Sequence, residues 1–193
     1  MTAEDTHLAE AQQVLEKADL IYSASQIEQA IALLAENINR QLGSTSRPVI
    51  VIPIMNGGLI LGGQLITRLK FPLLVDYLHA TRYRDETTGA ELQWLAKPQQ
   101  VLKNRVILII DDILDEGYTL SEVLNYCTQQ GAKQVYSAVL IEKDHLRPKA
   151  AVKTDFTGMH VEDRYVFGFG MDYRGYHRNL NGIYAVGNNE ERG

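Results

Sequence analysis

The chain has 193 residues, enough for one domain with a substantial core, and its formal net charge is −5 at pH 7. The basic residues are scattered, which argues against a nucleic-acid-binding surface. No apolar segment approaches the ~20 residues that span a bilayer, and the polar, acidic N-terminus is unlike a signal peptide. The single cysteine, Cys127, cannot form an internal disulfide. We therefore expect a cytoplasmic protein that binds neither membrane nor nucleic acid.

The first third of the chain predicts two helices. Residues 4–18 favour a polar helix. Ser25 and Glu28 have the spacing of a capping box, and they precede apolar residues at helical spacing over 27–42. Gly43 is a suitable end for this second helix.

Strands then alternate with helices. Residues 48–54 predict a buried strand, and the pair Gly57-Gly58 leads into a helix that reaches about residue 69. Residues 73–81 predict a second strand, and 82–91 an exposed loop or loose hairpin. Further strands are expected at 106–110 and 135–141, with a helix at 119–130 between them, and short strands at 165–169 and 183–186.

This alternation predicts an α/β fold, a twisted parallel sheet flanked by helices. We expect one domain over 1–193, with a core at about 44–145. The flanks at 1–40 and 150–193 do not continue the alternation, and we expect them to form a small hood over the sheet edge.

The segment 106–119 is the most informative in the chain. Five large apolar residues run directly into Asp111 and Asp112, and Asp115 opens a turn that contains Gly117. Ligands of parallel sheets bind beyond the carboxyl ends of the strands. Thr119 and Glu122 have capping-box spacing, and a helix that begins there would direct its amide groups at an anion. Carboxylates for hydroxyls beside amides for a phosphate indicate a sugar-phosphate site, although a solvated acidic turn is the plain alternative.

This segment resembles the signature of the type I phosphoribosyltransferases, in which two acids and two apolar residues precede Asp-Thr-Gly-x-Thr. The chain has Glu116 where that family has the threonine. The resemblance implies that Asp111 and Asp112 bind the ribose hydroxyls of 5-phosphoribosyl-1-pyrophosphate. It also implies that the turn holds the 5′-phosphate through main-chain amides and a threonine hydroxyl, with the residues Asp115, Glu116, Gly117, Tyr118 and Thr119.

Two further segments match parts of the same family. By resemblance, Asn56 and Gly57 form a turn that contacts pyrophosphate, and Arg82 and Tyr83 belong to a loop that closes over the active site. Without the resemblance, the first segment is an ordinary βα connection and the second a solvated charged loop.

The last third of the chain resembles the hypoxanthine-guanine branch. There Lys143 would donate to the 6-oxo group of a purine, Tyr165 would stack on the base, and Val166 and Met171 would lie beside it. The resemblance also implies that Asp172, with Asp111 and Asp112, serves a Mg²⁺ ion and that Arg178 contacts pyrophosphate. In isolation, Lys143 would be a surface lysine and Tyr165 a packing residue.

The resulting hypothesis is a purine salvage enzyme. It would move the 5-phosphoribosyl group to N9 of hypoxanthine, and also of guanine, with Asp115 as the general base that takes the proton from N7. The resemblance also implies a homodimer or homotetramer. Two alternatives stay open, a transferase that prefers xanthine or adenine and a non-catalytic regulator with the same fold.

Overall fold

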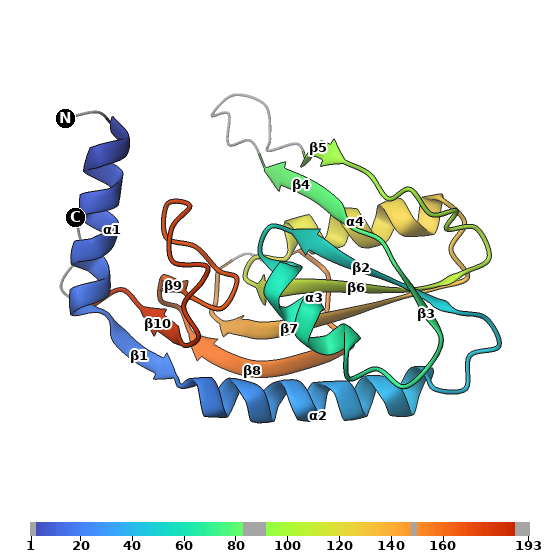
Figure 1. The fold of residues 1–193 in the computed structure, drawn as a ribbon. Coiled ribbons are helices and arrows are strands. Elements are labelled where there is room, and N and C mark those ends of the chain that lie inside the picture. The colour runs from blue at the N-terminus through green and yellow to red at the C-terminus, as the bar shows by residue number, and fades with distance from the viewer. Residues whose placement is uncertain (1–2, 83–91, 148–149, 188–193) are drawn as a thin grey trace.

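The computed structural model describes residues 3–82, 92–147 and 150–187. Figure 1 shows its elements, which follow one another as α1 (Ala3–Lys17), β1 (Asp19–Tyr22), α2 (Ala24–Leu42), β2 (Val49–Met55), α3 (Gly58–Ile66), β3 (Leu73–Val75), β4 (Leu78–Arg82), β5 (Leu92–Ala96), β6 (Val106–Leu114), α4 (Tyr118–Gln129), β7 (Gln134–Asp144), β8 (Phe156–Glu162), β9 (Val166–Phe167) and β10 (Ile183–Ala185).

A seven-stranded sheet forms the centre of the molecule. Its strand order is β5-β4-β2-β6-β7-β8, and β3 pairs with the first part of β2. All pairs are parallel except β4 with β5, which is antiparallel. The parallel strands β2, β6 and β7 therefore end at the same edge, on the left in Figure 1.

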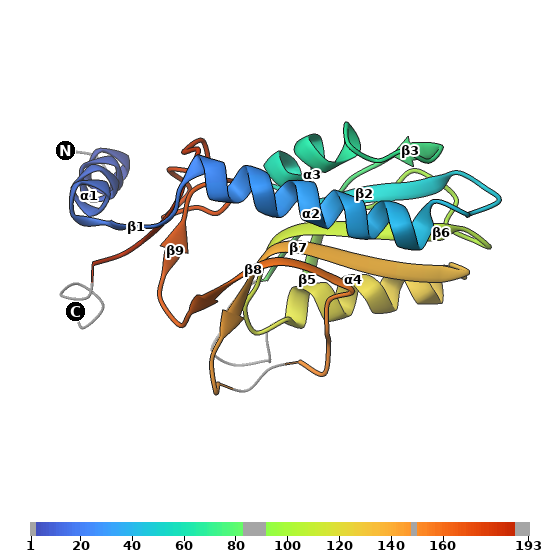
Figure 2. The ribbon, with the colours of Figure 1, turned by 90° about the horizontal axis from the view of Figure 1, so that it is seen from below.

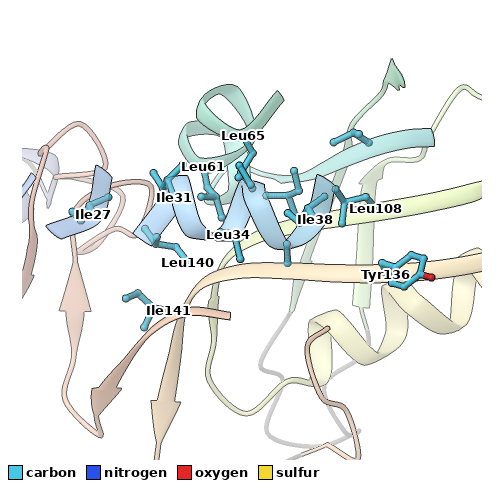
Figure 3. Close-up of a cluster of buried hydrophobic side chains, with 14 of the residues drawn as sticks. Ile27, Ile31, Leu34, Ile38, Leu61, Leu65, Leu108, Tyr136, Leu140 and Ile141 are labelled. Atoms are coloured by element: carbon cyan, nitrogen blue, oxygen red, sulfur yellow. The ribbon is translucent and has the colours of Figure 1, made fainter. Parts of the chain in front are cut away.

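Helices cover both faces of this sheet, as Figure 2 shows, with α2 and α3 on one face and α4 on the other. Alternate residues of the central strands pack in opposite directions. Leu108 and Ile110 of β6 join the cluster under α2 and α3, drawn in Figure 3, whereas Ile107 and Ile109 join the cluster under α4. Burial on both faces explains the unbroken apolar runs, and the predicted α/β fold is confirmed.

The two ends of the chain meet in a second, three-stranded sheet of order β1-β10-β9, with α1 beside it in both views of Figures 1 and 2. Two segments that the sequence suggested for the hood belong elsewhere. Helix α2 packs on the large sheet, and β8 continues that sheet beside β7. The sequence analysis did not anticipate β1, β5 or β8, which are short or lack a strong apolar pattern.

Three local predictions were wrong. The strand expected at 73–81 is interrupted at Asp76, whose carboxylate accepts hydrogen bonds from the backbone of Tyr77, Gln99 and Gln100. Helix α2 begins after Ser23 instead of Ser25, because the Gln26 side chain accepts a hydrogen bond from the Ser23 amide.

The third error concerns α4. Its N-cap is Gly117 and no side chain caps it, so Thr119 and Glu122 lie inside the helix and form no capping box.

Within the described ranges, no helix is both long and apolar enough to cross a membrane.

Helix α2 allows a direct test of the core. Leu34 is 2% exposed and Leu33 is 62% exposed. We expect Leu34→Ala to lower the free energy of unfolding by about 2–5 kcal/mol, because it leaves a cavity under the sheet. Leu33→Ala, the matched control, should change it by less than about 0.5 kcal/mol. Urea denaturation of both variants measures the difference, and equal losses would contradict this packing.

Candidate active site

Two adjoining cavities are lined by residues at the ends of β2, β6 and β7 and in the loop between β9 and β10. The first, of about 440 Å³, lies between the turn that follows β2 and the turn that follows β6. The second, of about 710 Å³, extends from β7 toward the β9–β10 loop. Both are lined by Asp112, Ile113, Asp115 and Asp172. We call them the β6-turn cavity and the β7 cavity.

Asp111 and Asp112 lie at the carboxyl end of β6, in the wall of the β6-turn cavity. Burial raises the pKa of both carboxyls, and the charge of Asp112 raises that of Asp111 further. The side chains are partly satisfied by the backbone, because the Asp112 amide donates to Asp111 at 3.0 Å and the Ile113 amide donates to Asp112 at 2.8 Å. Two desolvated carboxylates side by side favour binding of hydroxyl donors or a cation.

Glycines allow the surrounding turns to approach this acid pair. A Cβ atom on Gly57 would overlap the Asp112 carboxylate. Gly170, at φ +103°, lies against the Gly57 carbonyl, and a Cβ there would also overlap it. The turn after β2 and the β9–β10 loop thus close on Asp112 from two sides, which only residues without a side chain allow.

The turn after β6 leads directly into helix α4. Gly117, at φ +78°, makes the left-handed bend that starts the helix at Tyr118. The first amides of any helix lack intrahelical acceptors and lie at the positive end of its dipole. Since this turn lines the β6-turn cavity, it is suited to bind an anion.

Arg178 supplies positive charge to the same cavity. Its guanidinium is 2.5 Å from Asp172 and donates to the Gly170 carbonyl at 2.6 Å. The charge of Arg178 also acts on the acid pair, where it opposes the rise in the pKa of Asp111 and Asp112. The arginine is therefore placed to meet an anionic group bound beside these carboxylates.

The β7 cavity has a different character. Lys143 is 8% exposed, although it carries a charge, and Tyr165 is 47% exposed. Tyr165 meets Tyr173 edge to face, with ring centroids 5.4 Å apart, and burial raises its pKa. Val166 and Met171 complete a buried apolar part of the wall. A flat ring that carries a hydrogen-bond acceptor fits such a surface.

Asp115 stands between the two cavities and is surrounded by cationic groups. Lys143 Nζ donates to its Oδ2 at 3.3 Å, and Arg147 Nη2 donates to its Oδ1 at 2.6 Å. His145 Nε2 also lies 2.9 Å from Oδ1, although neither of its ring nitrogens has a hydrogen bond of good geometry. These contacts hold the Asp115 carboxylate between the two cavities, where its oxygens face a ligand bound in either one.

The structure brings together nearly every residue that the sequence analysis selected. The predicted residues Asp111, Asp112, Asp115, Glu116, Gly117, Tyr118, Thr119, Asn56, Gly57, Arg178 and Asp172 line the β6-turn cavity, and Lys143, Tyr165, Val166 and Met171 line the β7 cavity. Two predicted residues belong to the loop expected over 82–91. Arg82 ends β4, paired with Leu92, and Tyr83 lies outside the described residues.

Sequence reasoning missed His145, Arg147 and Asp163. Arg147 and Asp163 line the β7 cavity and make a two-pronged ion pair, from Nε at 2.9 Å and from Nη2 at 2.8 Å. Only their position in the sequence could have indicated His145 and Arg147 as site residues. Both follow the carboxyl end of β7, where ligands of parallel sheets bind.

Fold and cavities together define an α/β protein that binds ligands at the carboxyl edge of a parallel sheet. The family model described as "Phosphoribosyl transferase domain" matches residues 17–174. The chain belongs to this phosphoribosyl transferase family.

Relatives within the family carry a common name. A hypoxanthine-guanine phosphoribosyltransferase of Staphylococcus epidermidis is 30% identical over 153 residues, which cover 75% of this chain and 84% of the relative. One from Aquifex aeolicus is 25% identical over 171 residues, covering 88% and 95%. The crystal structure of a hypoxanthine-guanine phosphoribosyltransferase from Bacillus anthracis superposes with a TM-score of 0.79 at 25% identity, covering 87% of this chain and 98% of that one.

The approach of Gly57 to Asp112 can be tested by adding one methyl group. Gly57→Ala should displace the Asp112 carboxylate or the turn, and it should cost about 1–3 kcal/mol of stability through overpacking. Gly63 in α3 has open space where a methyl group would lie, with no neighbouring atom within 4 Å, so Gly63→Ala is the matched control. It should leave the melting temperature unchanged or raise it, since alanine is favoured in helices by about 1 kcal/mol. Calorimetry of both variants measures the contrast, and a neutral Gly57→Ala would refute the close contact.

Proposed function

We propose that the protein transfers the 5-phosphoribosyl group of 5-phosphoribosyl-1-pyrophosphate to N9 of a 6-oxopurine, hypoxanthine or guanine, in purine salvage. The observation that carries this proposal is the pair of adjoining cavities with Asp112, Ile113, Asp115 and Asp172 in both walls. A donor in one cavity and an acceptor in the other would meet at this shared wall, as a two-substrate transfer requires. The names of the relatives agree with this assignment.

The β6-turn cavity suits the phosphoribosyl donor. In this proposal the amides at the start of α4 bind the 5′-phosphate and Asp111 and Asp112 accept hydrogen bonds from the ribose hydroxyls. The pyrophosphate group lies by the turn of Asn56 and Gly57, with Arg178 as its cationic partner.

The β7 cavity suits a 6-oxopurine. An ammonium group can only donate hydrogen bonds, so Lys143 matches the 6-oxo group and disfavours the 6-amino group of adenine. Tyr165 offers the face on which the base stacks, with Val166 and Met171 beside it. Lys143 Nζ and Asp115 Oδ2 lie 3.3 Å apart. The lysine can donate to O6 and the aspartate can accept from protonated N7, and these two atoms are neighbours on one edge of the purine.

The reaction breaks the bond from C1 of ribose to the pyrophosphate oxygen and forms the bond from C1 to N9. The proton that the base loses goes from N7 to Asp115. Positive charge develops on the ribose, where the carboxylates of Asp111 and Asp112 stabilise it. Closure of the loop around Arg82 and Tyr83, which we also propose, would exclude water from this cation-like state.

The acids of the β6-turn cavity fit a Mg²⁺ ion. Within the described residues, no three or more His, Cys, Asp or Glu side chains form a ready-made metal site. Mg²⁺ characteristically takes one or two carboxylates together with substrate phosphates. Burial is the main cause of the raised pKa of Asp111 and of Asp112, and a nearby cation would offset the cost of their buried negative charge. We propose that Asp172, Asp111 and Asp112 would hold the ion, which would supply positive charge to offset that of the leaving pyrophosphate. We further propose a cytoplasmic homo-oligomer, as the family resemblance implies.

Asp115→Asn tests the general base. We expect kcat to fall by about 10²–10⁴-fold, because the amide cannot accept the N7 proton, while KM for the donor changes only a few fold. The assay is pyrophosphate release with the donor, Mg²⁺ and hypoxanthine. Asp144→Asn is the matched control, since this aspartate ends β7 but pairs with the exposed His160. Undiminished turnover by Asp115→Asn would remove this residue from the mechanism.

Lys143→Ala tests the choice of base. The hypoxanthine-to-adenine ratio of kcat/KM should fall by at least about tenfold, because the variant loses the donor to the 6-oxo group. The same release assay, run with hypoxanthine, guanine, xanthine and adenine, gives the ratio. Lys153→Ala, at an exposed position, serves as the control. A wild-type chain that prefers adenine or xanthine would redirect the substrate assignment, and an unchanged ratio would exclude Lys143 as its determinant.

A further inference from the structure

Glu116 places a carboxylate in the turn that we propose for the 5′-phosphate, where the family signature has threonine. A carboxylate beside a bound phosphate is a like-charge contact that weakens binding. In this structure the carboxylate has a cationic partner, because Arg147 Nη1 donates to Glu116 Oε1 at 3.0 Å.

The same guanidinium connects three carboxylates from two parts of the chain. Besides Glu116, it contacts Asp115 in the turn after β6 and Asp163 after β8. Its Nε, Nη1 and Nη2 atoms each donate to an acid. The hydrogen bond to Asp163 is the largest cause of the raised pKa of Arg147, and the contacts with Asp115 add to it. The same Arg147–Asp163 hydrogen bond lowers the pKa of Asp163. The arginine is thus a fixed positive charge, held over the turn by its fork geometry.

We propose that Arg147 is a positioning residue that offsets the charge of Glu116, so that a turn carrying an acid can bind the 5′-phosphate of the donor. The inference rests on the proposed function. Arg147 would also hold the candidate base Asp115, which gives the residue two separable effects. Loss of the charge that offsets Glu116 weakens binding of any ligand with a 5′-phosphate. Loss of the contact with Asp115 lowers kcat.

The main alternative is that Arg147 leaves Glu116 and binds the phosphate itself. The two ideas predict different behaviour when both side chains change. If Arg147 acts by offsetting Glu116, its removal matters only while the acid is present. If Arg147 binds the phosphate, its removal matters whatever residue stands at 116.

A double-mutant cycle distinguishes these cases. Glu116→Thr, Arg147→Ala and the double variant are compared by calorimetric titration with inosine 5′-monophosphate, and with inosine, which lacks the phosphate. We expect Arg147→Ala to weaken nucleotide binding by about tenfold, a modest loss because both side chains are partly exposed and screened. Inosine reports any effect of Arg147 on the purine cavity, and after correction for that change the double variant should bind the nucleotide within about twofold of Glu116→Thr.

Turnover supplies the second readout. Arg147→Ala should also lower kcat through Asp115, and Glu116→Thr should not restore that loss. Arg147→Lys keeps the charge without the fork, so it should retain more of the nucleotide affinity than Arg147→Ala. Arg174, a second arginine of the β7 cavity, is paired with Glu10 instead. Arg174→Ala is the matched control, and its effect should add independently to that of Glu116→Thr.

Two results would overturn the inference. If the double variant binds the nucleotide as weakly as Arg147→Ala, Arg147 contacts the phosphate directly. If Arg147→Ala binds as tightly as the wild type, Arg147 has no part in phosphate binding. Melting temperatures show whether each variant is folded. A folded wild-type chain that neither binds the nucleotide nor releases pyrophosphate would instead refute the proposed function, on which the inference depends.

Discussion

The organisation of the candidate site depends on two neighbouring carboxylates at the end of a strand that is buried on both faces. Asp111 and Asp112 lose water there, which raises the pKa of both and makes their negative charge costly. The structure offsets this cost with the backbone amides of Asp112 and Ile113 and with the charge of Arg178. The close turns at Gly57 and Gly170 follow from the same requirement, since they enclose Asp112 and bring Arg178 beside the pair.

Much of this arrangement could be predicted because its causes are local. A strand covered by helices on both faces must be apolar throughout, so β2, β6 and β7 were visible in the sequence without knowledge of their partners. Parallel strands place their carboxyl ends at one edge, so residues after β2, β6 and β7 converge whatever the connections between them. Asn56 and Lys143 were assigned to the site of Asp115 by the family resemblance, and this geometry explains why the three residues meet although they are far apart in the chain.

The features that escaped prediction depend on contacts between distant segments. Two overlapping capping-box patterns occur near the start of α2, and the structure uses the one of Ser23 and Gln26. The break between β3 and β4 arises because Asp76 binds backbone amides 23 and 24 residues away. Arg147 and Asp163 are 16 residues apart and meet only because β7 and β8 are neighbours in the sheet. The spacing of apolar residues in the sequence does not predict such ion pairs, because each charged residue taken alone resembles a solvated surface residue.

The balance of charges in the site explains how an acidic protein can bind an anionic donor. The β7 cavity is lined by four cationic residues, Lys143, Arg147, Arg164 and Arg174, and by the four acids Asp112, Asp115, Asp163 and Asp172. The wall of the β6-turn cavity has more acids than basic residues. In the proposed function, the helix amides, Arg178 and the proposed Mg²⁺ ion supply the attraction for the donor there. An added acid such as Glu116 is tolerable in that cavity only with a compensating charge nearby. In the described structure Arg147, which lines the β7 cavity, provides this charge, so a single side chain links the charge balance of the two cavities.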